Sequence, residues 1–212
     1  MANSIQEYRG KEIVIRFEGK KCIHSRNCVL GQPEVFVASG KPWVRPDGAG
    51  AEDIAALVQT CPSGALTYER LDGGKQEQAP AANVIRIREN GPLAAHAELV
   101  LGDQPAGYRA TLCRCGASKT KPFCDGSHTA IGFSASGEPA TQESQPLAVR
   151  NGPLKLSPQP NGPLKVEGAL EICSGTGRTI TWTAEAWLCR CGGSKNKPFC
   201  DGTHKKIGFT AE

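Results

Sequence analysis

The feature that most constrains this chain is a duplicated, cysteine-rich segment. Residues 113–133 recur as residues 189–209 with 16 of 21 positions identical, which indicates two copies of one structural unit. Each copy carries four ligand-type residues in the pattern C-x-C-x8-C-x3-H. They are Cys113, Cys115, Cys124 and His128 in the first copy, and Cys189, Cys191, Cys200 and His204 in the second. Three thiolates and one imidazole can complete a metal's coordination, so the sequence predicts two equivalent metal sites.

Composition supports metal binding over disulfides. Ten cysteines occur in 212 residues with only 6% aromatic side chains, 25 Gly and 15 Pro, so the chain is turn-rich and poor in large core residues. The first nine residues lack the apolar segment of a secretory signal. We therefore expect a reducing, cytoplasmic setting in which the thiols stay free to bind metal. No apolar run approaches the roughly 18 residues that a membrane helix requires, so no membrane partner is expected.

Turns and alternating strands indicate how the duplicated part is organised. The turn Asn90-Gly91-Pro92 precedes the first motif, and its counterpart at residues 161–163 precedes the second. We expect Gly to take the positive φ of these turns. Residues 84–88 and 180–183 alternate like strands, and residues 134–146 have the composition of a linker. These patterns predict two strand-rich units, at residues 83–134 and 147–212.

Residues 1–75 lie outside the repeat and predict a small α+β domain. Residues 12–18 alternate as a strand with Ile13, Ile15 and Phe17 on one face, and residues 53–61 show helical spacing of apolar positions. Pro62 should end that helix, and residues 65–68 can return as a strand. The fold class expected for the whole chain is therefore α+β and rich in β-structure.

The spacing of the repeated ligands bears on which metal they bind. A zinc ion would accept each set as a closed Cys3His site, but structural zinc more often uses pairs with two to four intervening residues. In a two-iron cluster, a close pair can hold one iron while a second pair holds the other. Gly126 permits a tight turn at the second pair, and Asp125 and Ser127 can cap a helix start there.

These residues resemble the CDGSH iron-sulfur family. The family pattern C-x-C-x2-[ST]-x3-P-x-C-D-G-[STA]-H is met at every position in both copies. The resemblance implies one [2Fe-2S] cluster per unit, with the C-x-C cysteines on an inner iron and the final Cys and His on an outer iron. It also implies that CDGSH units pair, so two units in one chain would form an intramolecular pseudo-dimer and the chain would act as a monomer.

The N-terminal cysteines resemble a divergent single-cluster ferredoxin domain. Cys22, Cys28 and the remote Cys61-Pro62 match a C-x2-C-x2-C…C-P framework in which Ser25 replaces the middle cysteine. The resemblance implies a third cluster, either [3Fe-4S] or [4Fe-4S] with His24, Ser25 or a small molecule as fourth ligand. The alternative is a unit without a cluster, holding reduced thiols or a Cys22–Cys28 disulfide.

The remaining cysteine, histidine and tryptophans have ordinary structural interpretations. Cys173 has no partner in the first repeat, and we expect it to be a packed free thiol. His96 also lacks a counterpart in the other repeat and should lie on the surface. We expect the tryptophans to be core or rim aromatics; they are Trp43, Trp182 and Trp187.

The function expected from these sites is electron transfer or cluster donation, with a redox protein or an apo-acceptor as partner. Cofactor loops and nucleophile motifs are missing from the sequence, so an enzyme is not expected. The net charge is only +4, and no basic stripe with interleaved aromatics indicates nucleic-acid binding. Two alternatives remain open, namely a structural zinc module for protein binding and a redox or pH sensor.

The histidine ligand should set the chemistry of each duplicated site. A neutral imidazole in place of a thiolate removes negative charge and should raise the reduction potential. A protonated imidazole cannot bind iron, so the clusters should be acid-labile at the outer iron. Beside the histidines, Thr129 and Ala130 of the first copy correspond to Lys205 and Lys206 of the second. The second site should therefore be more electropositive and easier to reduce.

Overall fold

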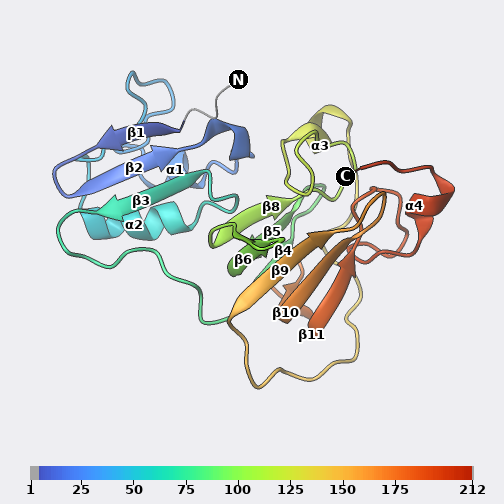
Figure 1. Ribbon diagram of the computed structural model, residues 1–212. Helices are drawn as coiled ribbons and strands as arrows, with labels where there is room; N and C mark the ends of the chain where they lie inside the picture. Colours follow the sequence, from blue (N-terminus) through green and yellow to red (C-terminus); the bar gives the residue numbers. More distant parts are fainter. Residues whose placement is uncertain (1–4, 212) are drawn as a thin grey trace. The chain divides into compact units, whose positions relative to one another are not determined.

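The structure, a computed structural model, describes residues 5–211 (Figure 1). It divides into two compact units, with the division after Gln78, inside the link expected between residues 75 and 83. Both units combine strands with short helices, and strands predominate. The expected α+β, strand-rich class is therefore confirmed.

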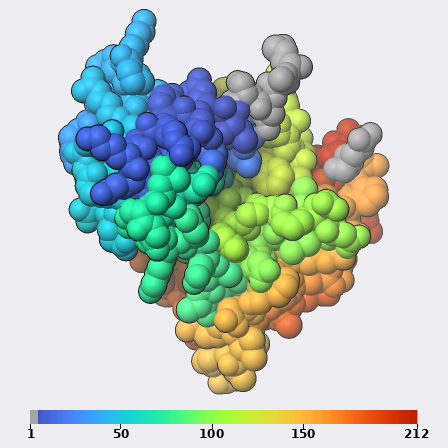
Figure 2. Space-filling model, turned by 60° about the vertical axis from the view of Figure 1, so that its left-hand side comes forward, coloured from blue at the N-terminus to red at the C-terminus, as the bar shows by residue number. Residues whose placement is uncertain are grey.

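The N-terminal unit is built on a three-stranded antiparallel sheet. Its order is β1 (Gln6–Arg9), β2 (Ile13–Phe17), β3 (Leu66–Arg70). In Figure 2 the surfaces of residues near 10 (blue) and of residues near 70 (green) accordingly adjoin. Three helical segments complete the unit: η1 (Gly19–Lys21), α1 (Asn27–Gly31) and α2 (Ala51–Gln59). The fully buried core residues come from strands, loop and helix; they include Ile13, Ile15, Val35, Phe36, Ile54 and Val58.

The N-terminal elements differ from their predicted bounds in ways that have local causes. Helix α2 begins two residues earlier than predicted, after Gly50, and places Glu52 and Asp53 in its first turn, where carboxylates favour a helix N-terminus. It ends before Cys61, whose N–H bonds to the Val58 carbonyl. Strand alternation placed Val14 on the face opposite the core, yet this side chain is fully buried.

The C-terminal unit is an eight-stranded sheet with two short helices. Its strands are β4 (Val84–Ile87), β5 (Leu93–His96), β6 (Glu98–Leu101), β7 (Gln104–Pro105), β8 (Arg109–Leu112), β9 (Pro153–Pro158), β10 (Leu164–Cys173) and β11 (Thr179–Leu188). The order is β7-β6-β9-β10-β4-β5-β8, with β11 along the other edge of β10. The helices are α3 (Ser127–Ala130) and α4 (Thr203–Lys206).

The strands of the two repeats interleave within this sheet. Strands β4 and β9 each precede an Asn-Gly-Pro turn in their own repeat. Strand β4 pairs in parallel with Glu171–Cys173 of β10, and β9 pairs in parallel with β6. Each repeat thus contributes one strand that pairs with the other repeat. Residues of both repeats share one hydrophobic cluster, in which Ile85, Leu99, Leu154 and Ile172 are fully buried.

The Asn-Gly-Pro turns tie the strands to the chain that follows each Cys/His motif. Asn90 and Asn161 have the positive φ values, 48° and 51°, so the expectation that Gly would take this conformation was wrong. Asn tolerates the left-handed region because its side chain can bond locally. Here Asn90 Oδ1 accepts from Ala135 N at 3.0 Å and Asn161 Oδ1 accepts from Ala211 N at 2.9 Å.

Residues 131–152 contain no helix or strand, as expected of a linker, but they are held against the sheet. Gln142 N donates to Ile180 O at 2.9 Å, and Trp182 N donates to Ser144 Oγ at 3.1 Å. Cys173 is buried and free, as predicted. Over residues 5–211, none of the helices has the length and apolarity needed to cross a membrane.

Candidate metal centres

The first repeat presents its four predicted ligands as two close pairs. Cys113 and Cys115 follow β8, and their Sγ atoms lie 3.8 Å apart. Cys124 precedes α3, and its Sγ lies 3.4 Å from Nδ1 of His128 on that helix. Backbone bonds join the two pairs, because Cys113 N donates to Pro122 O and Cys124 N donates to Thr111 O, both at 2.8 Å.

The second repeat reproduces this geometry. The Sγ atoms of Cys189 and Cys191 lie 3.8 Å apart, and Cys200 Sγ lies 3.4 Å from His204 Nδ1. Cys189 N again donates to a proline carbonyl, that of Pro198, at 2.8 Å. The two sites are therefore built alike although their upstream strands differ in length.

The ligands occur as pairs rather than as a tight quartet. Within residues 5–211, no three Cys, His, Asp or Glu side chains gather closely enough to hold one metal ion. A single zinc ion needs all four ligands around it. Two separated pairs suit a cluster with two metal atoms, so the donor set and its spacing fit the expected cofactor.

The turn that carries each histidine is fixed by an aspartate. Asp125 Oδ1 accepts from Ser127 N at 3.0 Å and Oδ2 accepts from Lys119 N at 2.8 Å. These bonds, which stabilise the charged carboxylate, outweigh burial and lower the pKa of Asp125 to about 2. Gly126 has φ of 86° and donates its N–H to Cys124 Sγ at 3.4 Å. Asp201 holds the second turn in the same way.

Burial and hydrogen bonding act in opposite directions on the ligand thiols. The hydrogen bond with Cys115 outweighs burial and lowers the pKa of Cys113 to about 6. Burial prevails at Cys124 and Cys189. Removal from water raises the pKa of Cys124 to about 11 and that of Cys189 to about 11. These thiols therefore keep their protons at neutral pH until a bound cation displaces them.

A buried arginine between the paired cysteines is a supporting residue that motif reasoning missed. Arg114 is 1% exposed. Its Nε donates to Gly91 O at 2.8 Å and its Nη2 donates to Arg88 O at 2.6 Å, while Ala135 O and Ser136 O accept two further bonds. The guanidinium therefore joins the turn before the motif to the chain after it.

Arg190 has the same role in the second repeat. It is 1% exposed and donates to Gly162 O at 3.0 Å, to Gln159 O at 2.5 Å and to Ala211 O at 3.3 Å. The signal was available in the sequence, because the residue between the paired cysteines is Arg in both copies. Its burial could not be read from the sequence, since an Arg in a turn is usually exposed.

The two C-x-C turns meet each other across the unit. Gly116 lies against the carbonyl of Cys191, and Gly192 lies against the carbonyl of Cys115, so closely that neither position has room for a Cβ atom. Two cation–π contacts also join the two repeats, one in each direction. Lys121 Nζ is 5.8 Å from the ring centroid of Phe209, and Lys197 Nζ is 6.0 Å from that of Phe133.

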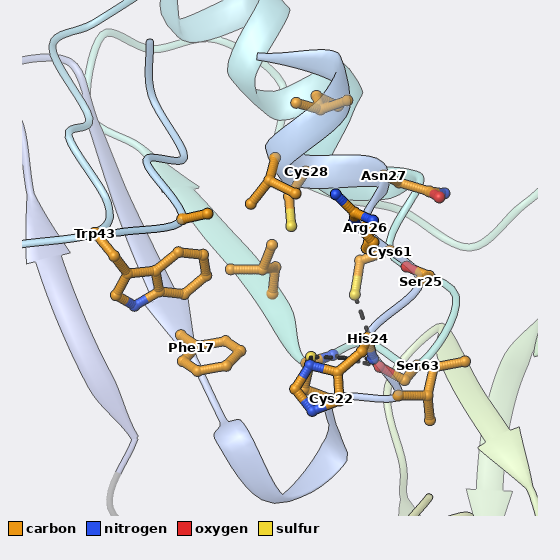
Figure 3. Close-up of a pocket in the computed structure, with 16 residues that line it drawn as sticks. Phe17, Cys22, His24, Ser25, Arg26, Asn27, Cys28, Trp43, Cys61 and Ser63 are labelled. Carbon is orange, nitrogen blue, oxygen red and sulfur yellow. Dashed lines mark hydrogen bonds between the residues drawn. The ribbon is translucent and has the colours of Figure 1, made fainter. Parts of the chain in front are cut away.

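In the N-terminal unit, the three predicted cysteines line one pocket (Figure 3). Cys22 precedes α1, Cys28 lies on α1, and Cys61 follows α2, so three segments bring them together. The pocket has a volume of about 440 Å³ and a mostly apolar lining, with Phe17 and Trp43 on one side. Cys22 and Cys28 are not joined by a disulfide.

Comparison with known proteins agrees with both parts of this architecture. Residues 74–129 and 161–205 match the iron-binding zinc finger of CDGSH type, and residues 8–71 match the divergent 4Fe-4S mono-cluster domain. CDGSH iron-sulfur domain-containing protein 1 of Mus musculus is 33% identical over 90 residues, which cover 42% of this chain and 78% of that protein. The Rattus norvegicus protein of that name is 33% identical over 85 residues, 40% of this chain and 73% of its own length.

A further relative matches a shorter stretch of the chain. The uncharacterized protein YjdI of Escherichia coli strain K12 is 41% identical over 61 residues, 29% of this chain and 80% of YjdI. Fold, ligand pairs and relatives together define an iron-sulfur protein. The chain belongs to the CDGSH iron-sulfur family, and it carries a divergent 4Fe-4S mono-cluster domain ahead of two CDGSH segments.

Proposed function

We propose that each CDGSH unit holds one [2Fe-2S] cluster and that the protein carries electrons or donates clusters rather than catalysing a reaction. The first set of ligands is Cys113, Cys115, Cys124 and His128; the second is Cys189, Cys191, Cys200 and His204. A bound cluster of this kind supplies reversible one-electron chemistry.

The observation that carries this proposal is the repeated pair-and-pair geometry. In both repeats a Cys–Cys pair at 3.8 Å accompanies a Cys–His pair at 3.4 Å. The first cysteine of each motif is buried, whereas each histidine and the second cysteine of each motif are half-buried. Each pair therefore keeps at least one partly exposed ligand, which suits exchange of an electron or a cluster with a redox protein or an apo-acceptor.

Reciprocal contacts support an internal pseudo-dimer, so that one chain would suffice for function. The exchanged strands, the two glycine–carbonyl contacts and the two Lys–Phe contacts each occur once in either direction. Such two-way contacts are the pattern of an isologous interface. We accordingly expect a monomer in solution, with both centres in one body.

A third centre is proposed in the N-terminal pocket, with Cys22, Cys28 and Cys61 as ligands of a [3Fe-4S] or [4Fe-4S] cluster. The three thiols line one cavity with an apolar wall, and the volume falls within the roughly 300–1,000 Å³ of small-molecule sites. Burial raises the pKa of Cys22 and of Cys28, so these thiols also stay protonated until a cation binds and displaces the proton.

The proposed function is tested by metal and sulfide analysis of the purified full-length protein. We expect iron with matching acid-labile sulfide in both CDGSH units, a coloured protein, and an additional, spectroscopically distinct centre by EPR. A colourless protein with stoichiometric zinc would contradict the cluster assignment. Incubation with an apo-ferredoxin then separates the two roles, because a donor loses iron to the acceptor whereas a carrier keeps its iron through repeated reduction and oxidation.

Replacing both CDGSH histidines with cysteine should lower the reduction potentials and make the centres more resistant to acid. The added thiolate charge favours the oxidised state, with a shift on the order of 100 mV inferred from the effect of paired histidines. Burial lowers the pKa of His128, so its ligating neutral form persists below the ordinary histidine pKa and is lost only on further acidification. His128→Cys/His204→Cys should lose visible absorbance at lower pH than the parent; an unchanged pH of loss would contradict this account.

Exchanging the residues beside the two histidines should exchange the order of their potentials. Lys205 and Lys206 are exposed next to His204, whereas Thr129 and Ala130 occupy these places in the first repeat. Exposed charges contribute about 0.2–1 kcal/mol, which corresponds to roughly 10–40 mV for one electron. We expect Lys205→Thr/Lys206→Ala to lower the second potential, and Thr129→Lys/Ala130→Lys to raise the first, in redox titrations at low salt. A shift that persists at high salt would rule out exposed charge as its cause.

A further inference from the structure

The N-terminal pocket offers three cysteine ligands, and its fourth ligand remains to be assigned. Five polar residues besides the cysteines line it: His24, Ser25, Arg26, Asn27 and Ser63. A guanidinium offers a metal no lone pair, and the Asn27 side chain donates to Thr60 O at 2.9 Å, which leaves His24, Ser25 and Ser63. Because a cubane cluster takes four ligands, the identity of the fourth decides whether the site holds four irons stably. The contacts and chemistry of these three residues show which of them can act as the fourth ligand.

Ser63 supports a ligand rather than acting as one. It is 4% exposed, and its Oγ lies 3.7 Å from Cys61 Sγ while accepting the N–H of Ala65 at 3.3 Å. Its hydroxyl proton can therefore point at the Cys61 sulfur. Hydrogen bonds of this kind to ligand sulfurs tune a cluster's potential.

Ser25 occupies the position of the missing cysteine but has the wrong chemistry. A metal ligand must be available without its proton, and an aliphatic hydroxyl keeps its proton at neutral pH. A neutral imidazole presents a free lone pair at the same pH and is a good ligand for iron. Chemistry therefore favours His24 over Ser25, although spacing in the sequence favours Ser25.

The geometry places His24 with the cysteines. Its N–H donates to Cys22 Sγ at 3.4 Å, and its Nδ1 lies 4.0 Å from the same sulfur; Figure 3 shows the imidazole ring beside Cys22 at the pocket. The loop reaches this arrangement through left-handed backbone at His24, φ 55°, and Arg26, φ 65°, a conformation that costs free energy in residues with a Cβ.

We infer that His24 supplies the fourth protein ligand of the N-terminal centre, through Nδ1, with Cys22, Cys28 and Cys61 as the other three. All three centres of this chain would then be three-cysteine, one-histidine sites. The inference rests on the proposed third centre and narrows its type to [4Fe-4S]. The imidazole is exposed, so this ligand lies on the solvent side of the pocket.

The test uses the full-length protein and a probe of nitrogen coordination. In the His128→Cys/His204→Cys background, His24 and His96 are the remaining histidines of the four in the chain. Pulsed EPR of the reduced protein should show a strongly coupled nitrogen on the N-terminal centre that responds to ¹⁵N-histidine labelling. The coupling should vanish in His24→Cys, which keeps a four-cysteine cluster, and should persist in the matched controls Ser25→Ala and His96→Gln.

A second measurement does not depend on the altered CDGSH units. In the otherwise unchanged chain, Mössbauer spectra of His24→Ala should show conversion of the N-terminal centre to a three-iron cluster, while Ser25→Ala should retain four irons. A four-iron centre without histidine coupling, or with coupling that survives His24→Cys, would overturn the assignment of His24 as a ligand but leave the third centre in place. Iron confined to the two CDGSH units would overturn the third centre itself.

Discussion

In Gly116→Ala, we expect the C-terminal unit to lose stability and both CDGSH centres to lose iron. Gly116 has φ of 83° and no room for a Cβ beside the carbonyl of Cys191. The left-handed backbone costs a residue with a Cβ about 1–2 kcal/mol, and forcing atoms into a filled contact costs about 1–3 kcal/mol more. Because the clash pushes one C-x-C turn against the other, the damage should reach the centre of the other repeat.

Gly107→Ala is the matched control for this prediction. Gly107 has φ of 80° in the same unit, but the space around its Cβ position is open. It should show only the backbone cost of about 1–2 kcal/mol and should retain iron at both centres. Urea unfolding midpoints and iron content measure the difference. If Gly116→Ala is no more destabilising than Gly107→Ala, the two turns do not meet as described.

The second large effect should come from Arg114→Ala. The substitution removes a buried guanidinium that donates to four backbone carbonyls. Gly91 O and Ser136 O lose this donor, whereas Arg88 O and Ala135 O keep backbone donors, Gly91 N and Asn90 N. Hydrogen bonds to charged groups are worth about 1.5–3 kcal/mol each, and they are not additive, so we expect a loss of about 3–5 kcal/mol, the range found when one member of a buried charged network is removed. The first centre should lose its cluster before the second, because Arg114 lies between Cys113 and Cys115.

Arg150→Ala separates this effect from the loss of any arginine. The Arg150 side chain is 51% exposed and pairs with Glu171, and exposed pairs contribute about 0–1 kcal/mol. Arg190→Ala should reverse the order in which the centres fail, as EPR of partly unfolded samples can show. Equal unfolding midpoints for Arg114→Ala and Arg150→Ala would contradict a structural role for the buried guanidinium.

Local sequence accounts for most of what can be stated about the CDGSH sites. Each ligand set spans 16 residues, and within that span the spacing already separates a Cys–Cys pair from a Cys–His pair. Supporting contacts such as the Asp125 bonds to Ser127 N and Lys119 N are equally local. The alternating apolar residues likewise predicted strands β2 and β4, because the two-residue period of a strand can be read directly from the sequence.

The N-terminal centre needed the tertiary structure. The match to a ferredoxin framework drew attention to Ser25, since that residue occupies a ligand position. Only the folded loop shows His24 Nδ1 beside the Cys22 sulfur and Ser63 Oγ beside the Cys61 sulfur. Cys61 is distant in sequence from Cys22 and His24 but lines the same pocket. The loop that carries His24 contains two left-handed residues, His24 and Arg26, which no periodic pattern reveals.

The sequence by itself determined the duplication, the two ligand sets and the strand-rich class, because those properties reside in short segments and their spacing. The tertiary structure decided that β4 and β9 each pair with the other repeat, that Arg114 and Arg190 are buried, and that Gly116 and Gly192 face carbonyls across the unit. The strand and glycine contacts join residues 55 to 87 positions apart, and the arginine contacts join residues 21 to 31 positions apart. Their partners are selected by shape, by hydrogen-bond satisfaction and by burial in a shared core, and none of these is visible until the chain has folded.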